Sequence, residues 1–146
     1  MEENHWVRYY RMINGMRVMD DFYDVTIKPD GSILNVSKSK DTIMETELSQ
    51  AEVVAGQASV MQLSAPMVLS SENPSDSIVD SKNYIQLVKK DGQIIPVQFI
   101  ETTHHHEEPE IEGFEYNYLE ITCMNLLDGS FIDYDSIISV EYADEL

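Results

Sequence analysis

Four Asn-Gly or Asp-Gly dipeptides constrain this chain more than any other feature of its sequence. They stand at residues 14–15, 30–31, 91–92 and 128–129, each between two segments that contain many apolar residues. Asn, Asp and Gly tolerate the positive φ angles of a two-residue hairpin loop, so each dipeptide predicts a tight turn between antiparallel strands. The chain is therefore expected to be organised around β-hairpins.

Alternating apolar and polar residues mark the strands of the N-terminal third. Residues 5–13 combine aromatic residues with interleaved arginines, and residues 23–28 alternate strictly. Tyr23, Val25 and Ile27 are the apolar set of that alternation and are expected to face the interior. The mixture of arginines and rings predicts stacked cation–π pairs across neighbouring strands.

The second half continues with hairpins. Pro96 follows the third turn and cannot donate to a strand ladder, which predicts that its strand lies at an edge of the sheet. A polar excursion is expected over residues 102–113, followed by a long strand, the fourth hairpin and a last strand over residues 138–142. The apolar residues expected to face inward after the third turn are Ile95, Val97 and Phe99.

One main helix is expected, over residues 49–64. Ser49 and Glu52 have the spacing of a capping box, in which side chains satisfy free backbone amides at the start of a helix. Leu48 and Val53 have the spacing of a hydrophobic staple. Small apolar residues then recur at helical spacing, which predicts a helix lying close against a sheet. These residues are Ala51, Val54, Ala55, Ala58 and Met61.

Together these patterns predict an α+β fold, with about eight or nine strands in antiparallel hairpins and one helix packed on the sheet. Residues 70–82 contain many Ser, Asn, Pro and Asp residues and predict a linker loop. Residues 1–69 would then form a hairpin-and-helix half. Residues 83–146 would form a β-rich half, either a small barrel or the continuation of the same domain.

The distribution of charge bears on partners. The net charge is −18, and residues 101–146 contain 13 acidic residues and no lysine or arginine. Such a surface repels nucleic acid and anionic membranes, and it suits a basic partner or divalent cations. No apolar run is long enough to cross a bilayer, so direct membrane insertion by this chain is not expected. A cytoplasmic location is expected if Met1 is the native start, and an extracytoplasmic or cell-surface location if the chain belongs to a longer protein.

The histidines at 104–106 are the one group that suggests chemistry. On an extended backbone His104 and His106 share a face and could bind zinc, nickel or copper, with Glu107 or Glu108 as a third ligand. Their polar surroundings favour an exposed loop instead, so no firm metal site and no cofactor are expected. Known catalytic motifs are absent from the sequence, so the protein is predicted not to be an enzyme, with a metal-dependent enzyme as the alternative. The single cysteine, Cys123, is expected to be a small core residue.

Two segments carry a family resemblance. Residues 10–18 (YRMINGMRV) and 23–33 (YDVTIKPDGSI) resemble the opening of a PepSY/FTP-like domain. That group includes propeptides of secreted metalloproteases and YycI-type extracytoplasmic regulators of a sensor kinase. The resemblance implies a non-catalytic inhibitory or protein-binding module, the extracytoplasmic part of a longer protein. Residues 84–142 also resemble a small SH3- or Sm-like barrel, a fold that binds peptides or nucleic acid.

Two functions follow from the sequence. The first is a non-catalytic, regulatory module that binds a protein partner, itself basic, through a sheet face or edge. The alternative is an intracellular, acidic inhibitor, for example a phage-borne one, whose carboxylates in residues 101–146 imitate nucleic-acid phosphates on one convex face. The residues expected to contact a protein partner are Trp6, Arg8, Tyr10, Glu107, Glu108, Glu110 and Glu112.

Overall fold

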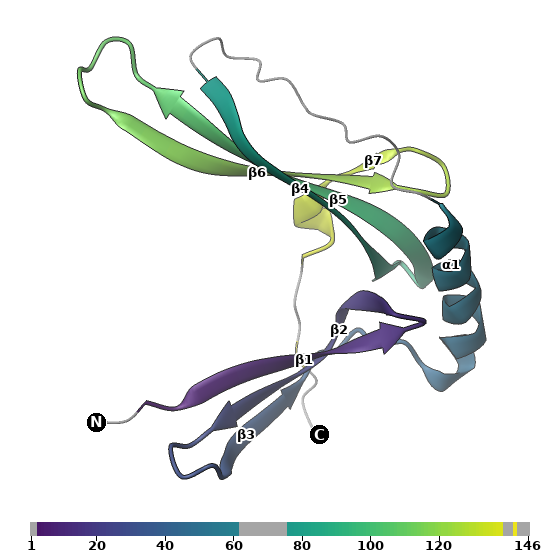
Figure 1. The fold of residues 1–146 in the computed structure, drawn as a ribbon. Helices are drawn as coiled ribbons and strands as arrows, with labels where there is room; N and C mark the ends of the chain where they lie inside the picture. The colour runs from purple at the N-terminus through teal and green to yellow at the C-terminus, as the bar shows by residue number, and fades with distance from the viewer. Residues whose placement is uncertain (1–2, 62–75, 139–141, 143–146) are drawn as a thin grey trace.

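The computed structural model describes residues 3–61, 76–138 and 142, and strands dominate it (Figure 1). Strands make up 59% of the structure and helix 15%. The seven strands form one open, mixed sheet with a single short α-helix. The expected α+β class is therefore wrong. The hairpins were anticipated, but the strands are longer than expected and the helix is shorter.

The N-terminal hairpin follows the turn signal closely. Strands β1 (His5–Ile13) and β2 (Met16–Ile27) are antiparallel and are joined by Asn14 and Gly15, which have φ angles of 48° and 78°. Strand β3 (Ile33–Lys38) pairs with the other side of β2. The loop before β3 spans residues 28–32, so the two-residue turn expected at residues 30–31 is wrong.

The apolar alternation in β2 does not predict which face is buried. Tyr23 is 47% exposed, whereas Phe22 and Asp24 on the opposite face are buried. The expected inward set of Tyr23, Val25 and Ile27 is therefore wrong. The buried face of β2 is polar as well as apolar because Asp24 has an ionic partner in β1, described below.

The C-terminal strands form a broad antiparallel group. Strands β4 (Asp76–Lys90) and β5 (Gln93–Glu107) meet at the predicted turn, where Asp91 and Gly92 have φ angles of 51° and 74°. Strand β6 (Glu115–Asn125) follows, and the short strand β7 (Phe131–Ile132) pairs only with its end. Two expected loops are thus partly strand. Residues 76–82 belong to β4, and residues 102–107 belong to β5; the rest of the expected linker, 70–75, lies outside the described residues.

Strand β5 is central, not an edge strand. It pairs with β4 on one side and β6 on the other. A proline is tolerated in this central strand because the backbone of Pro96 faces Leu126, the residue just after the end of β6. The Leu126 amide donates a hydrogen bond of 3.0 Å to the Pro96 carbonyl. The missing amide of Pro96 therefore interrupts neither ladder.

The two groups of strands meet at one point. Val18 of β2 pairs in parallel with Leu87 of β4, and both side chains are buried in a cluster that also contains Ile13 and Ile94. Helix α1 (Leu48–Val60) lies beside the place where the two groups of strands meet (Figure 1). Small residues of its predicted stripe are buried against this cluster. Those buried in the helix are Ala51, Val54, Ala55 and Ala58.

The helix starts earlier than the capping motif suggested. A short 3-10 helix, Glu45–Glu47, leads directly into α1, and the Met44 amide donates to the Glu47 carboxylate at 3.0 Å. Ser49 therefore lies inside the helical segment and does not cap it. Val53 is 60% exposed, so the expected hydrophobic staple is also wrong.

A second core lies under the opposite face of the C-terminal sheet. Val97, Phe99 and Cys123 are buried there, as expected, beside a short 3-10 helix, Tyr134–Ser136. Burial raises the pKa of Cys123 to about 11, consistent with an unreactive core residue. Of the last expected strand, residues 139–141 lie outside the described residues, and Tyr142 forms an isolated bridge with Ser39. No helix in the described ranges is long and apolar enough to cross a membrane.

Candidate functional site

The arginine–aromatic face of β1 is an internal network. The Arg8 guanidinium donates to both oxygens of Asp24, at 2.7 and 3.1 Å, and lies 3.8 Å from the centre of the Phe22 ring. Tyr142 donates its hydroxyl to the same carboxylate at 2.6 Å. Arg8 lowers the pKa of Asp24, and Asp24 raises that of Arg8. The predicted stacking is confirmed, and the charge of Arg8 is used within the protein.

The remaining residues of this face are more accessible. Trp6 is 60% exposed, with the Arg8 guanidinium 5.1 Å from its ring centre. Tyr10 is half-buried, and the guanidinium of Arg17 lies 4.3 Å from the centre of its ring. Of the three partner-binding residues predicted here, Trp6 therefore offers the largest free surface.

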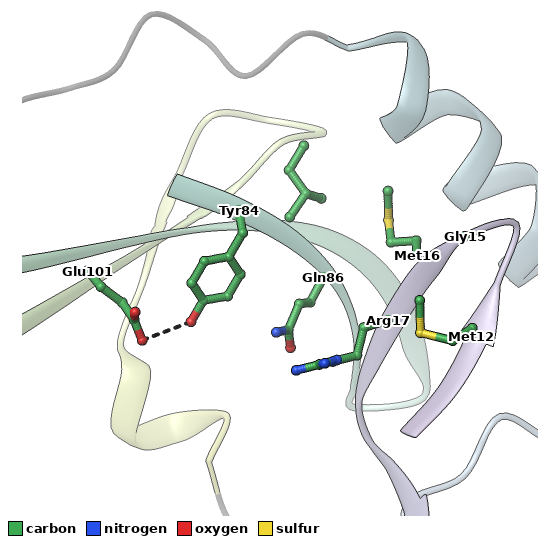
Figure 2. Close-up of a pocket in the computed structure, with 8 residues that line it drawn as sticks. Met12, Gly15, Met16, Arg17, Tyr84, Gln86 and Glu101 are labelled. Atoms are coloured by element: carbon green, nitrogen blue, oxygen red, sulfur yellow. Dashed lines mark hydrogen bonds between the residues drawn. The ribbon is translucent and has the colours of Figure 1, made fainter. Parts of the chain in front are cut away.

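A pocket of about 510 Å³ lies where the two groups of strands meet (Figure 2). Arg17 and Met12 line it from the N-terminal hairpin, and Tyr84, Gln86 and Glu101 line it from β4 and β5. The Tyr84 hydroxyl donates a hydrogen bond to the Glu101 carboxylate at 3.1 Å. The pKa of Tyr84 is raised, mainly by burial and secondly by this hydrogen bond. Tyr84 and Glu101 thus form a hydrogen-bonded pair in the wall of the pocket.

The three histidines lie on two faces of β5. His104 is 3% exposed and stacks on Tyr118, with ring centres 4.8 Å apart. Its two ring nitrogens have no hydrogen-bond partner in the described structure. His106 lies on the same face, as predicted, next to Tyr116.

His106 is held by carboxylates at both ring nitrogens. Its Nδ1 contacts Asp76, and its Nε2 lies 3.4 Å from Glu108. Asp76 also accepts the hydroxyl hydrogen of Tyr118. The pKa of Asp76 is lowered by Tyr118 and then by His106, and Asp76 raises the pKa of His106. These contacts tie the start of β4 to β5 and β6.

Glu107 does not join His104 and His106, because consecutive strand residues point to opposite faces. It lies instead with His105, whose Nε2 is 3.7 Å from Glu107 and 3.4 Å from Glu115 of β6. The Nδ1 of His105 is 2.6 Å from the Asn117 carboxamide oxygen, the main cause of the raised pKa of His105. The structure thus places Glu107 away from His104 and His106 and Glu108 beside His106, and it gathers a different group of possible metal ligands around His105.

The predicted acidic contact residues gather at the tip of the β5–β6 hairpin. Glu107, Glu110 and Glu112 are exposed there, and Glu108 is half-buried beside His106. Ile111, at the same tip, is 55% exposed. The tip is thus negatively charged.

The outer edge of β6 was not anticipated as a site. The Asn125 amide donates to the Ser130 carbonyl at 2.8 Å, on the side away from β5. Backbone groups of alternate residues point the same way in an antiparallel strand, so those of Leu119 and Ile121 also point outward. Strand β7 pairs only with Cys123 and Met124. Among the described residues, no strand covers β6 from Glu115 to Thr122.

A groove of about 560 Å³ lies beside this edge. Leu119 and Phe131 line it and are 56% and 63% exposed. Carboxylates of Glu120, Asp133 and Asp135 line it as well. The sequence carried one signal of this edge. The strand expected over residues 114–126 is longer than the segment expected over residues 131–134, so that segment alone could not pair with all of it.

Comparison of the chain with family models, with curated proteins and with solved structures finds no match. The resemblances to a PepSY/FTP-like domain and to an SH3- or Sm-like barrel therefore stay predictions.

Proposed function

We propose that this protein is a non-catalytic binding module that takes up an extended, basic segment of a partner protein along the outer edge of β6. The observation that carries this proposal is the uncovered stretch of β6 from Glu115 to Thr122. An exposed edge of this kind presents amides and carbonyls that an added strand can pair with. Main-chain hydrogen bonds would supply affinity without demanding one particular sequence.

The chemistry of the groove supports a segment with alternating apolar and basic residues. Successive side chains of an added strand point to opposite faces, so every second one can reach the groove side. Leu119 and Phe131 offer apolar contacts, and Asp133 and Asp135 offer charge to lysine or arginine. The absence of lysine and arginine from residues 101–146 leaves these carboxylates without a basic residue from the same part of the chain.

The remaining predictions on function are kept as proposals. A regulatory or inhibitory role, a place in the extracytoplasmic part of a longer protein, and the acidic inhibitor of the alternative hypothesis rest on the sequence. The partner is expected to be a protein and not nucleic acid, because a surface this acidic repels phosphates.

The test uses a short fluorescent peptide of alternating lysine and valine, with binding followed by anisotropy. Leu119→Pro removes one outward amide and places a ring where the added strand would lie, while leaving the β5 ladder intact. We expect the affinity to fall at least about tenfold, since each lost main-chain hydrogen bond contributes about 1 kcal/mol and the ring adds a steric clash. Leu119→Thr keeps the amide and is expected to retain affinity within about threefold.

Two peptide controls separate pairing from charge attraction. A peptide with N-methylated alternate residues keeps its lysines but cannot form the ladder, and it should not bind. A glutamate–valine peptide keeps the backbone groups but should be repelled. Equal binding of the native and N-methylated peptides, or equal binding by the Pro and Thr variants, would contradict the proposal. Circular dichroism of each variant checks that the sheet is retained.

A further inference from the structure

The distal end of the β5–β6 hairpin brings together one histidine and two glutamates. His105 and Glu107 are alternate residues of β5 and share a face, and Glu115 of β6 is the direct cross-strand partner of Glu107. Potential ligand atoms of the three residues all lie within 4.8 Å of one another. This group lies on the opposite face from His104 and His106 and is separate from the groove beside β7.

The distances suit a tetrahedral ion. Zinc bonds to imidazole nitrogen and carboxylate oxygen are about 2.0–2.2 Å long, so two ligand atoms of a tetrahedral zinc ion lie about 3.3–3.6 Å apart. The Nε2 of His105 already lies 3.4 Å from Glu115 and 3.7 Å from Glu107. The side chains of Glu107 and Glu115 are 71% and 60% exposed, so both are free to change rotamer and close on an ion.

The two glutamates also present an electrostatic problem that a cation would solve. Like charges directly opposite each other on neighbouring strands destabilise a sheet. In the part of the chain that the structure describes, neither Glu107 nor Glu115 forms an ion pair with a lysine or arginine; the ion pairs of both are with His105. A divalent cation would neutralise the pair.

The ring of His105 is already oriented for binding. The Asn117 carboxamide oxygen lies 2.6 Å from Nδ1 and can only accept, so Nδ1 carries the hydrogen. In the neutral ring, the lone pair then lies on Nε2, the nitrogen that faces the two carboxylates. Histidines that bind metals are held in this way by a hydrogen bond from their other ring nitrogen.

We propose that His105, Glu107 and Glu115 bind one zinc ion, with Asn117 positioning the imidazole. The mixed nitrogen and oxygen donors favour zinc over magnesium or calcium, which prefer oxygen alone. With three protein ligands, a fourth position is left for water or for a group from another molecule. This proposal does not depend on peptide binding at the edge of β6.

The test is a titration of the full chain with zinc chloride in which calorimetry measures the heat of binding. We expect one site in the wild type, loss of that site in His105→Ala, and loss in the near-isosteric Glu115→Gln, which preserves the shape of the hairpin. Asn117→Ala should retain the site with about 10- to 100-fold weaker affinity, as expected for the loss of a hydrogen bond to a metal ligand.

Two matched variants serve as controls. His5→Ala removes an exposed histidine near the N-terminus. His106→Ala removes the histidine that Asp76 and Glu108 hold on the opposite face of β5. Both should bind zinc as the wild type does. Nitrogen-15 NMR should show zinc at Nε2 of His105 while Nδ1 stays protonated. Unchanged zinc binding by His105→Ala, loss of binding in His106→Ala, or coordination through Nδ1 would overturn the proposal.

Discussion

The N-terminal strands β1–β3 and the C-terminal strands β4–β7 bury different kinds of side chain. In the first group Asp20, Asp21 and Asp24 are all buried. In the second group β5 buries a continuous, mainly apolar run from Ile94 to Ile100. One group is thus organised around charges that need partners, and the other around a conventional apolar core.

Three cations of the N-terminal group, Arg8, Arg11 and Lys38, pair with its buried aspartates. Asp21 accepts from Lys38 at 2.6 Å and from the Ile43 amide at 3.0 Å, with Arg11 at 3.8 Å. Arg8 is engaged by Asp24 in the same way. The carboxylates of residues 101–146 have no lysine or arginine among them. The proposed binding surfaces lie on the C-terminal group, where the carboxylates of Glu107 and Glu115 pair with His105 and not with a lysine or arginine.

Removing the centre of the apolar core should have the largest effect. Phe99 is 1% exposed, stacks on Tyr84 at 5.3 Å and meets the edge of Tyr134. We expect Phe99→Ala to lower the free energy of unfolding by about 3–5 kcal/mol, from lost burial and the cavity left behind. Urea denaturation measures this. Phe131→Ala is the matched control: that ring is 63% exposed, so a change within about 0.5 kcal/mol is expected.

Breaking a charge pair in the N-terminal group should lower the free energy of unfolding by less than Phe99→Ala does. Asp24→Asn leaves the guanidinium of Arg8 over Phe22 without its carboxylate; the side chains of Arg8 and Asp24 are 23% and 7% exposed. Losing one partner of a buried pair costs about 3–5 kcal/mol, and partial exposure of Arg8 reduces this to about 2–3 kcal/mol. Chemical denaturation at neutral pH checks it, with Asp80→Asn at an exposed position of β4 as control. A loss below 0.5 kcal/mol, within the range of ordinary surface changes, would mean that the N-terminal group does not depend on its charges.

Asp20 is the exception within the same group, and its substitution should stabilise. Burial, together with the negative charge of Asp41, raises the pKa of Asp20 to about 6. A carboxyl whose folded pKa exceeds its unfolded value binds more protons when folded, so stability falls as pH rises from about 4 to 6. We expect Asp20→Asn to raise the free energy of unfolding by about 1–2 kcal/mol at pH 7.5, with little change at pH 4. Denaturation curves across this range decide it; a gain that is equal at both pH values would exclude titration of Asp20 as the cause.

Local turn chemistry was predictable at two of the four dipeptides, whereas those at residues 30–31 and 128–129 lie in five-residue loops. The dipeptides Asn14-Gly15 and Asp91-Gly92 specify their hairpins because positive φ is a property of the residues themselves. The length of each strand and its place in the sheet depend instead on pairing with distant segments. Residues 102–107 read as a polar excursion, yet they are strand because β4 and β6 pair with both sides of β5. Tertiary pairing therefore overrides composition there.

Only part of the candidate metal site could be predicted from the sequence. The alternation of strand residues places Glu107 with His105, and the histidine cluster itself was visible. Glu115 and Asn117 join it only through the register that pairs Glu107 with Glu115, which no single segment encodes. The same holds for the buried face of β2, since Asp24 is inward because Arg8 lies opposite it. Pairing between distant segments supplied what the sequence pattern could not.

The smallest expected effect tests whether the two groups of strands are energetically separate. Gly15 and Gly92 lie in equivalent turns, one in each group, with φ angles of 78° and 74° and no neighbouring atom within 4 Å of an added Cβ. Alanine at either position therefore incurs only backbone strain, about 1 kcal/mol. Ile13 and Val18 share a cluster with Leu87, Ile94 and helix α1, so the groups should unfold together. Gly15→Ala and Gly92→Ala should then lower one common thermal midpoint by similar amounts. Two separate transitions, each moved by only one variant, would show that the contrast in buried side chains corresponds to two independently folding units.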